Sequence, residues 1–213
     1  MTLLRDSIYQ SIRNAILLGE FQPGQELREQ TLAERYHVSR APVRDSLLRL
    51  ELENLVTVRP RQGYLVNPIS ISNVEDIIDL RSLIEPACAA AAAQADDNTV
   101  VRALDRFRGF ADQDFEEARY VEYNESFHLS VADLSNNKRV AAVALDLIQQ
   151  FKRVVRVVVS SFNPEAVRRD CAEHEAIIDA IQAHDADRAF RLAHEHAKAA
   201  RERLTTALRA TTR

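Results

Sequence analysis

The chain has 213 residues, of which 46% are hydrophobic, and a formal net charge of −4; this suffices for one or two filled cores, and two domains fit best. Its only cysteines, Cys88 and Cys171, imply no disulfide framework and are expected to be reduced thiols. No stretch approaches a membrane span or the apolar segment of a signal peptide, so we expect a soluble, cytoplasmic protein with no membrane partner.

The first predicted element is an amphipathic helix over residues 4–18, because apolar residues recur there at helical spacing and the turn Pro23-Gly24 follows. A second, shorter helix is expected over residues 29–36. The segment His37-Val38-Ser39 then interrupts the periodicity, and Ser39 is expected to cap the next helix with its hydroxyl group.

A third predicted helix opens with three arginines in ten residues. Pro42 falls in its first turn, where the missing N–H costs nothing. One stripe of apolar residues at helical spacing predicts the buried face of this helix: Val43, Leu47, Leu50 and Leu55. Arg40 and Arg44 therefore lie at the N-terminal end of the helix.

Two short strands are expected next, over residues 55–58 and 63–66, joined by Arg59-Pro60-Arg61-Gln62-Gly63. Three helices followed by a two-stranded wing are typical of a winged helix-turn-helix DNA-binding domain, which we place at residues 1–68. In such a domain the N-terminal end of the third helix reaches the base edges in the major groove.

Arginines suit both parts of this predicted DNA surface. The planar guanidinium groups of Arg40 and Arg44 can bond O6 and N7 of a guanine together, or contact an adjacent phosphate. Arg59 and Arg61 at the wing tip suit a narrow, electronegative minor groove. The alternative for any single arginine is a solvated helix face shared with the neighbouring acidic residues.

Charge is distributed unevenly between the two parts of the chain. Residues 1–70 hold nine Arg and eight Asp or Glu, a net charge of +1, so the remainder carries −5. The DNA-facing charge is therefore local, and the acidic remainder is expected to have a different role.

After a short linker at residues 67–70, the low glycine content and helical periodicity predict an antiparallel all-α bundle of about six helices over residues 72–213. Ser72-Asn73-Val74-Glu75 resembles a capping box, and Pro86 is expected to kink the first helix. The other expected helices cover residues 98–115, 117–135, 137–160, 164–183 and 186–209.

Three histidines lie in phase with the apolar stripes of three separate predicted helices: His128, His174 and His196. Buried imidazoles need polar partners, and Asn124 lies one turn before His128. One interpretation is a shared divalent cation, because neutral imidazole is the commonest metal ligand; the other is a set of core histidines bonded to carbonyl groups. No inward-phased Asp or Glu is expected beside these histidines, so a cation there would keep its full charge.

Arg81 is in phase with the apolar residues of the first bundle helix. A buried guanidinium is costly without an anionic partner. Two partners are open: a small di- or hydroxy-carboxylic acid that bridges the metal and Arg81, or a salt bridge to Glu85 one turn on.

Both halves resemble the GntR family of transcriptional regulators, in particular the FadR-type subgroup with an FCD effector domain. The matching segments are LREQTLA at 27–33, VSRAPVRDSLLRL at 38–50, Gly63, LRSLIEPACAAAAA at 80–93, NESFHLSVADLSNN at 124–137, EHEAIIDAI at 173–181 and DADRAFRLAHEH at 185–196. They cover nearly the whole chain.

The resemblance implies a homodimer that binds double-stranded palindromic operator DNA and holds a divalent metal, Zn or Ni, with a small carboxylate effector. It implies DNA contacts by Arg28, Ser39, Arg40, Arg44 and Gly63, and metal ligation by Asn124, His128, His174 and His196. Two residues depart from the family pattern: Gln30 stands where relatives often have arginine, and Asn124 where many have aspartate, so the metal site carries one negative charge fewer.

We therefore expect a ligand-responsive transcriptional regulator, a repressor, and not an enzyme. The alternative function is a metal-dependent hydrolase fused to a DNA-binding module, in which the three histidines leave an open position for an activated water. The expected lack of a carboxylate base beside the histidines argues against it. A DNA-binding architectural protein would leave the buried polar residues unexplained.

Overall fold

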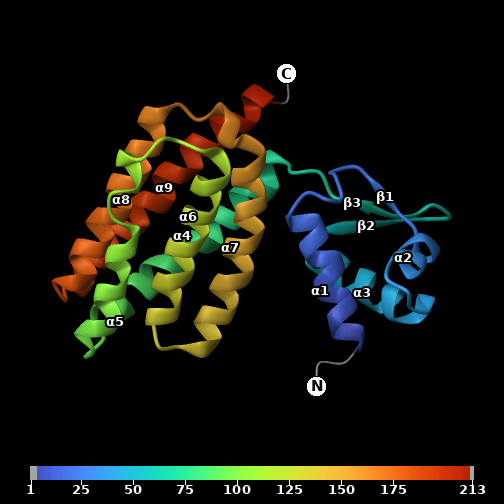
Figure 1. Cartoon of the computed structure of the whole chain (residues 1–213), viewed down its shortest axis with the longest axis horizontal. Helices are drawn as coiled ribbons and strands as arrows, with labels where there is room; N and C mark the ends of the chain where they lie inside the picture. The colour runs from blue at the N-terminus through green and yellow to red at the C-terminus, as the bar shows by residue number, and fades with distance from the viewer. Residues whose placement is uncertain (1–3, 212–213) are drawn as a thin grey trace. The chain divides into compact units, whose positions relative to one another are not determined.

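The computed structural model describes residues 4–211 and divides into two compact units, one up to Ile69 and one from Ser70 onward (Figure 1). The N-terminal unit has three helices and three strands: α1 (Leu4–Leu17), β1 (Glu26–Leu27), α2 (Glu29–Arg35), α3 (Arg40–Leu52), β2 (Val56–Arg59) and β3 (Gly63–Val66). The predicted winged helix-turn-helix fold is confirmed.

The sheet of this unit has one strand more than expected. β3 lies in the centre of the antiparallel order β1-β3-β2, with Leu27 opposite Tyr64 and Val58 opposite Tyr64 on the other side. The two-residue strand β1 is too short to show an alternating pattern, so periodicity could not predict it. Figure 1 shows the β2–β3 hairpin extending beyond the helices of its unit.

The buried face predicted for α3 is present, because Val43, Leu47 and Leu50 are fully buried in a core shared with α1. Ser39 occupies the N-cap position of α3 with extended backbone. Its hydroxyl makes no capping hydrogen bond, so that part of the prediction is wrong. The side chain is exposed to solvent instead.

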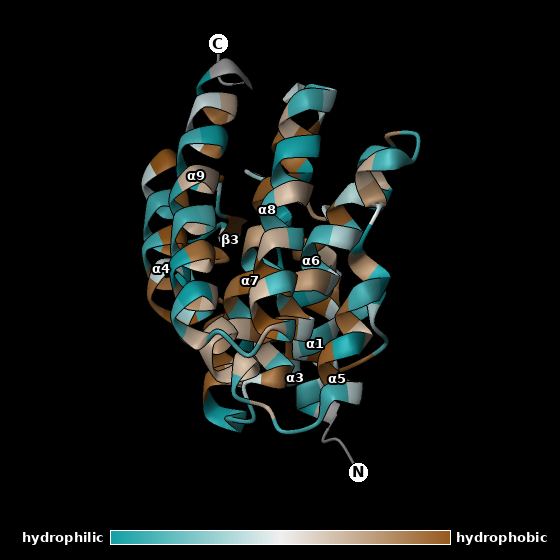
Figure 2. Ribbon diagram, turned by 90° about the vertical axis from the view of Figure 1, so that its left-hand side faces the viewer, coloured by the Kyte–Doolittle hydropathy of each residue, from teal (hydrophilic) through white to brown (hydrophobic). Residues whose placement is uncertain are grey.

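The C-terminal unit contains six α-helices and three short 3₁₀ helices, in agreement with the predicted bundle. They are α4 (Ile71–Ala93), α5 (Asn98–Arg102), η1 (Ala103–Phe107), η2 (Phe110–Asp112), α6 (Glu117–Leu134), α7 (Lys138–Val158), η3 (Val159–Ser161), α8 (Pro164–Gln182) and α9 (Ala186–Thr211). Figure 2 shows hydrophobic and hydrophilic residues on different faces of these helices.

Helix α4 begins earlier than the proposed capping box. The Ser70 hydroxyl accepts a hydrogen bond from the Asn73 backbone N–H, so Ser70, not Ser72, is the N-cap. The helix runs through Pro86 to Ala93. It packs most extensively against α9 and also contacts α6, α7 and α8, which places it beside the three helices that carry the predicted metal ligands.

The single helix expected over residues 98–115 is replaced by α5, η1 and η2. Gly109 adopts φ +67, a left-handed conformation that ends helical continuity and that glycine adopts without a steric penalty. The break lets two aromatic rings pack on Tyr123: Phe107 edge-on and Phe110 stacked at 4.1 Å. Aromatic packing between segments, not local periodicity, therefore decides the fold here.

Cys88 and Cys171 are both buried free thiols. Within residues 4–211, none of the helices is long and apolar enough to span a membrane.

Candidate DNA-binding surface and metal centre

The arginines at the start of α3 are exposed and held by one carboxylate. Arg44 makes a bidentate ion pair with Glu29 on α2, with both N–O distances 2.8 Å, and Arg40 donates to the same carboxylate at 3.1 Å. The hydrogen bond from Arg44 is the main cause that lowers the pKa of Glu29. The side chains of Arg40 and Arg44 remain 60% and 55% exposed, so both are accessible to DNA.

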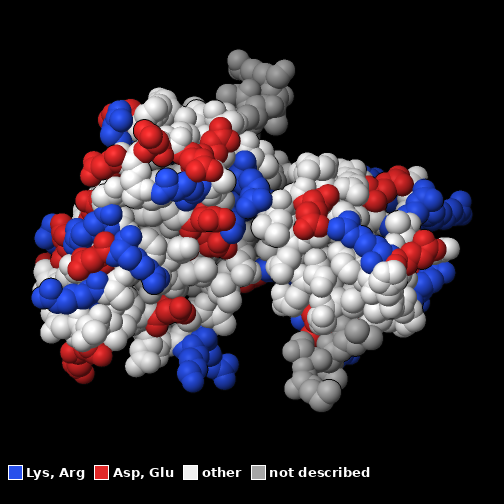
Figure 3. Space-filling model, in the orientation of Figure 1, with Lys and Arg blue, Asp and Glu red and all other residues white. Residues whose placement is uncertain are grey.

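The remaining predicted DNA contacts are also at the surface of this unit. Arg28, Ser39, Arg59 and Arg61 are exposed. Arg28 lies 3.5 Å from Glu26, and Arg61 adopts φ +68 at the wing tip. On the face drawn in Figure 3, basic and acidic side chains are interleaved over both units.

Gly63 has a structural reason to be glycine. It adopts φ +103, and a Cβ atom there would lie 2.6 Å from the backbone oxygen of Leu27. Because β1 and β3 pair at this point, the close approach of the two backbones leaves no room for a side chain.

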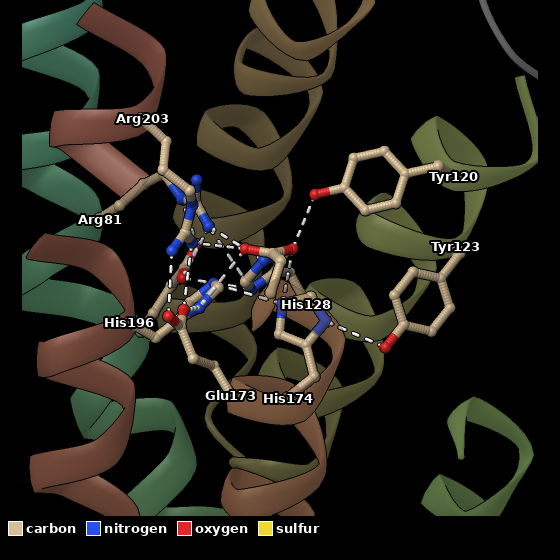
Figure 4. A network of polar contacts seen from close by, with 10 residues as sticks. Arg81, Tyr120, Tyr123, His128, Glu173, His174, His196 and Arg203 are labelled. Carbon is tan, nitrogen blue, oxygen red and sulfur yellow. Dashed lines mark hydrogen bonds and ion pairs between the residues drawn. The ribbon is translucent and has the colours of Figure 1, made fainter. Parts of the chain in front are cut away.

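The three predicted histidines lie together in the core of the C-terminal unit. His128 comes from α6, His174 from α8 and His196 from α9, and one ring nitrogen of each lies within 4.8 Å of the others. Nε2 of His174 is 3.2 Å from Nε2 of His196. Figure 4 shows the rings meeting between Arg81 and Arg203 on one side and Tyr120 and Tyr123 on the other.

Nδ1 of each of these rings has a polar partner of its own. Nδ1 of His196 lies 2.8 Å from Glu173, Nδ1 of His174 lies 3.1 Å from the Tyr123 hydroxyl, and Nδ1 of His128 lies 3.2 Å from Glu85. Metal-binding histidines are commonly oriented in this way by a carboxylate or another polar group on the second nitrogen.

Burial lowers the pKa of both His128 and His174 below the ordinary value, so the neutral imidazole is favoured at neutral pH. Neutral imidazole is the form that binds a metal. Two ligands at about 2.0–2.1 Å from one zinc ion lie roughly 3–3.4 Å apart, which the two Nε2 atoms satisfy. The donor set therefore fits a divalent transition-metal ion.

Asn124 is buried one turn before His128 and lines a small cavity together with Asp170 and His196. This cavity and a second one lined by Glu85, His128 and His196 each have a volume of about 10 Å³. That is about the minimum for one water molecule. A surface groove of about 390 Å³ is lined in part by Glu173 and His196.

The expectation that no carboxylate lies beside the histidines is wrong. Glu85, Asp170 and Glu173 all approach the rings, from 2.8 to 3.9 Å. Burial opposes ionisation of Asp170 most strongly, but His174, His196, Arg203 and the Tyr120 hydroxyl outweigh it and hold the pKa of Asp170 well below its ordinary value. Asp170 was detectable in the sequence, because it precedes His174 by one helical turn on the same face.

Arg81 forms a salt bridge with Glu85, which was one of the two partners that the sequence left open. Its Nε and Nη2 donate to the two oxygens of Glu85 at 2.5 and 2.9 Å, and its guanidinium lies 3.5 Å from the centre of the Phe151 ring. Nη2 is also 3.1 Å from Nε2 of His128. Among the described residues, Nη1 is buried without a hydrogen-bond partner.

Comparison with known families matches both units. Residues 4–66 match the bacterial regulatory proteins of the gntR family, and residues 76–199 match the FCD domain. The three histidines and α3 lie inside these matches.

Related proteins and solved structures are consistent with these two family matches. A transcriptional regulator of Streptomyces ambofaciens is 31% identical over 92% of this chain and 82% of its own length, and the transcriptional repressor RspR of Escherichia coli is 28% identical over 91% and 85%. The solved structure of E. coli McbR/YncC superposes on this chain with a TM-score of 0.76 and 20% sequence identity. The alignment covers 96% of this chain and 98% of that one and shows a similar fold.

The family and the relatives regulate transcription and are not enzymes. This sets the hydrolase alternative aside, although carboxylates do lie near the histidines. The chain belongs to the GntR family of DNA-binding transcriptional regulators and carries an FCD domain.

Proposed function

We propose that this protein is a dimeric repressor of the FadR type whose bundle binds a divalent metal, Zn or Ni, and a small carboxylate effector. The observation that carries the metal proposal is the set of three buried imidazoles with ligand atoms within 4.8 Å. A relative of similar length is named a repressor, which supports that direction of regulation.

The DNA-binding part of the proposal rests on the N-terminal end of α3. Arg40 and Arg44 project from it with exposed guanidinium groups, and these contact guanine edges or adjacent phosphates in the major groove. Ser39 and Arg28 contact the backbone nearby, and the wing with Arg59, Arg61 and Gly63 enters the minor groove. Because one module buries little DNA surface, two modules of a homodimer read a palindromic operator.

In the bundle, His128, His174 and His196 hold the metal through imidazole nitrogens, and Asn124 adds its amide oxygen. Nε2 of His174 and of His196 face each other, while Glu173 and Tyr123 orient these rings from outside. The bound ion supplies positive charge that attracts a carboxylate to an open coordination position.

Arg81 is the proposed second contact of the effector. Its Nη1 is buried and lacks a partner among the described residues, so one donor remains for an anion. Glu85 occupies the other donors, and the cavity beside it measures about 10 Å³. A di- or hydroxy-carboxylic acid therefore has to displace Glu85, and this movement of α4 side chains is the step that couples effector binding to the conformation of the bundle.

Elemental analysis and operator titrations test the proposal together. We expect about one equivalent of metal per chain, and operator affinity that changes when candidate carboxylic acids are added to the metal-loaded protein. His174→Ala should lose the metal and the response to the acid. His194→Ala, an exposed histidine of α9, is the matched control and should behave as wild type.

If the protein binds no metal, and His174→Ala keeps wild-type thermal stability in the presence of added metals, the histidines are ordinary core residues and the metal proposal is rejected. If metal binds but no acid changes operator affinity, the effector proposal is rejected.

A further inference from the structure

The proposed metal ligands are all uncharged. Three imidazoles and the Asn124 amide leave the two positive charges of the ion uncompensated in a buried site, which is costly. Given the proposed metal site, on which this inference rests, a nearby carboxylate has to supply the missing negative charge. Among the described residues, three carboxylates lie beside the histidine cluster: Glu85, Asp170 and Glu173.

Two of these carboxylates contact other nitrogens of the cluster. Glu173 is hydrogen-bonded to Nδ1 of His196, the nitrogen opposite the one that faces His174, and both its oxygens also accept from Arg203. Both oxygens of Glu85 accept hydrogen bonds from Arg81. Among the described residues, neither of these carboxylates lies within 4.0 Å of Nε2 of His174, the nitrogen that faces His196, whereas Asp170 does.

Asp170 lies beside the inner nitrogen of His174. Its Oδ2 is 3.8 Å from Nε2 of His174, the same nitrogen that lies 3.2 Å from Nε2 of His196. Its Oδ1 is 3.9 Å from Nδ1 of His196, so the carboxylate lies close to both rings. The 3.8 Å distance to Nε2 of His174 is longer than a hydrogen bond and only slightly longer than the roughly 3–3.4 Å between two ligands of one ion.

Asp170 is held in place by two neighbouring side chains. Its own side chain is buried, the Tyr120 hydroxyl donates to Oδ2 at 2.7 Å, and Arg203 donates to Oδ1 at 2.5 Å. Asp170 and Asn124 line the same small cavity beside His196. A carboxylate fixed from two sides, with an open cavity in front of it, is arranged as metal ligands usually are.

We propose that Asp170 is the anionic protein ligand of the metal, and that Tyr120 and Arg203 are its positioning residues. Asp170 contributes from α8 the negative charge that Asn124 does not contribute from α6. The site then has three imidazoles and one carboxylate, with the Asn124 amide beside it.

The test measures metal binding by the full-length protein, with Co²⁺ and Zn²⁺ as probes, by competition against a chromophoric chelator and by the visible spectrum of bound Co²⁺. Asp170→Asn should weaken binding about 10- to 100-fold and shift the Co²⁺ bands. The double variant Asn124→Asp with Asp170→Asn moves the carboxylate across the cavity and should regain at least part of the lost affinity. Asp179→Asn, on the exposed face of the same helix, is the control and should match wild type.

Tyr120→Phe provides a second route if Asp170→Asn does not fold, because it removes one hydrogen bond from Asp170 and leaves its charge in place. We expect weaker Co²⁺ binding and a smaller shift of the same bands. The assignment of Asp170 as a ligand is overturned if Asp170→Asn binds metal with wild-type affinity, or if it binds more weakly but its Co²⁺ bands are unchanged. In both cases the metal site itself stands. If Asp170→Asn does not fold, the assignment is overturned when Tyr120→Phe shows wild-type affinity and wild-type Co²⁺ bands. A wild-type protein that binds neither ion rejects the metal proposal itself.

Discussion

At the scale of single residues, the most consequential feature is the buried pair Arg81–Glu85. Arg81 is 1% exposed and Glu85 10%, and His128 touches both. Coulombic attraction to Arg81 and His128 and their hydrogen bonds outweigh the desolvation of Glu85 and hold its pKa far below the ordinary value. The pair therefore stays ionised, and each partner depends on the other.

Glu85→Ala should destabilise the C-terminal unit by about 3–5 kcal/mol, because it leaves the buried charge of Arg81 without a counter-ion. Urea denaturation followed by circular dichroism measures the free energy of unfolding. Glu165→Ala breaks an exposed pair with Arg168 and should cost less than about 1 kcal/mol. Equal costs for the two variants would show that Arg81 finds another partner.

Gly63→Ala should destabilise the N-terminal unit by about 1–3 kcal/mol, since it forces a strained backbone and places a Cβ against the oxygen of Leu27. Gly24→Ala is the control: its φ is +81, but a Cβ atom added there would meet no atom within 4 Å. The same denaturation experiment should rank Gly63→Ala as clearly worse. Two equal losses would mean that φ alone matters and that the contact with β1 does not.

At the scale of elements, α2 and α3 act as a pair. Glu29 on α2 holds Arg40 and Arg44 on α3 in one geometry before DNA is present. A preorganised guanidinium loses less conformational freedom when it binds a base than a free one does. We therefore expect this carboxylate to contribute to operator recognition without contacting DNA.

Arg44→Ala should lower operator affinity by about 1–3 kcal/mol, which is the usual contribution of an arginine that reads a base. Titrations at matched salt concentration measure it. Arg168→Ala, an exposed arginine of the bundle, is the control. Wild-type operator affinity in the Arg44 variant would remove Arg44 from the DNA-binding surface.

Glu29→Gln should separate specific from non-specific binding. Loss of the carboxylate frees both arginines and removes a negative charge near the DNA phosphates, so affinity for unrelated DNA should rise or stay constant while affinity for the operator falls. The ratio of the two dissociation constants is the measurement. An unchanged ratio would indicate that Glu29 does not preorganise the arginines.

At the scale of the whole molecule, the chain divides into two compact units. The proposed metal-binding residues all lie in the C-terminal unit and the proposed DNA-binding residues all lie in the N-terminal unit. Ligand binding to a folded unit stabilises that unit by mass action. Regulation requires in addition that operator and effector affinities be linked reciprocally.

Zn²⁺ at 100 times its dissociation constant should raise the unfolding free energy of the C-terminal unit by about 2.7 kcal/mol and leave the N-terminal unit unchanged. Hydrogen exchange resolves the two, with amides of α3 and of α8 as reporters. No change in α8 would contradict metal binding by the folded bundle, and an equal change in α3 would show that the units unfold together.

Light scattering should find a dimer both free and on operator DNA, because palindromic half-sites require two recognition helices related by a two-fold axis. A single half-site should bind the protein far more weakly than the complete operator. A monomer in both states would reject the proposed assembly.

Local features could be predicted from the order of the residues. Helical periodicity located α3, α6, α8 and α9, and the phase of His128, His174 and His196 within their helices placed each ring on a buried face. These features follow from residues a few positions apart, which share one helix and one set of backbone hydrogen bonds.

What those buried faces meet depends on the packing of the whole chain. Tertiary packing decides that β1 pairs with β3 and that Phe110 stacks on Tyr123 where one helix was expected over residues 98–115. It also decides that Arg81 binds Glu85 and that Asp170 lies near His196 on another helix. Most of these contacts join segments whose separation and angle depend on how helices pack and on where strands pair. Periodicity reports which side of a helix is buried, but only packing fixes which side chains from other helices lie opposite it.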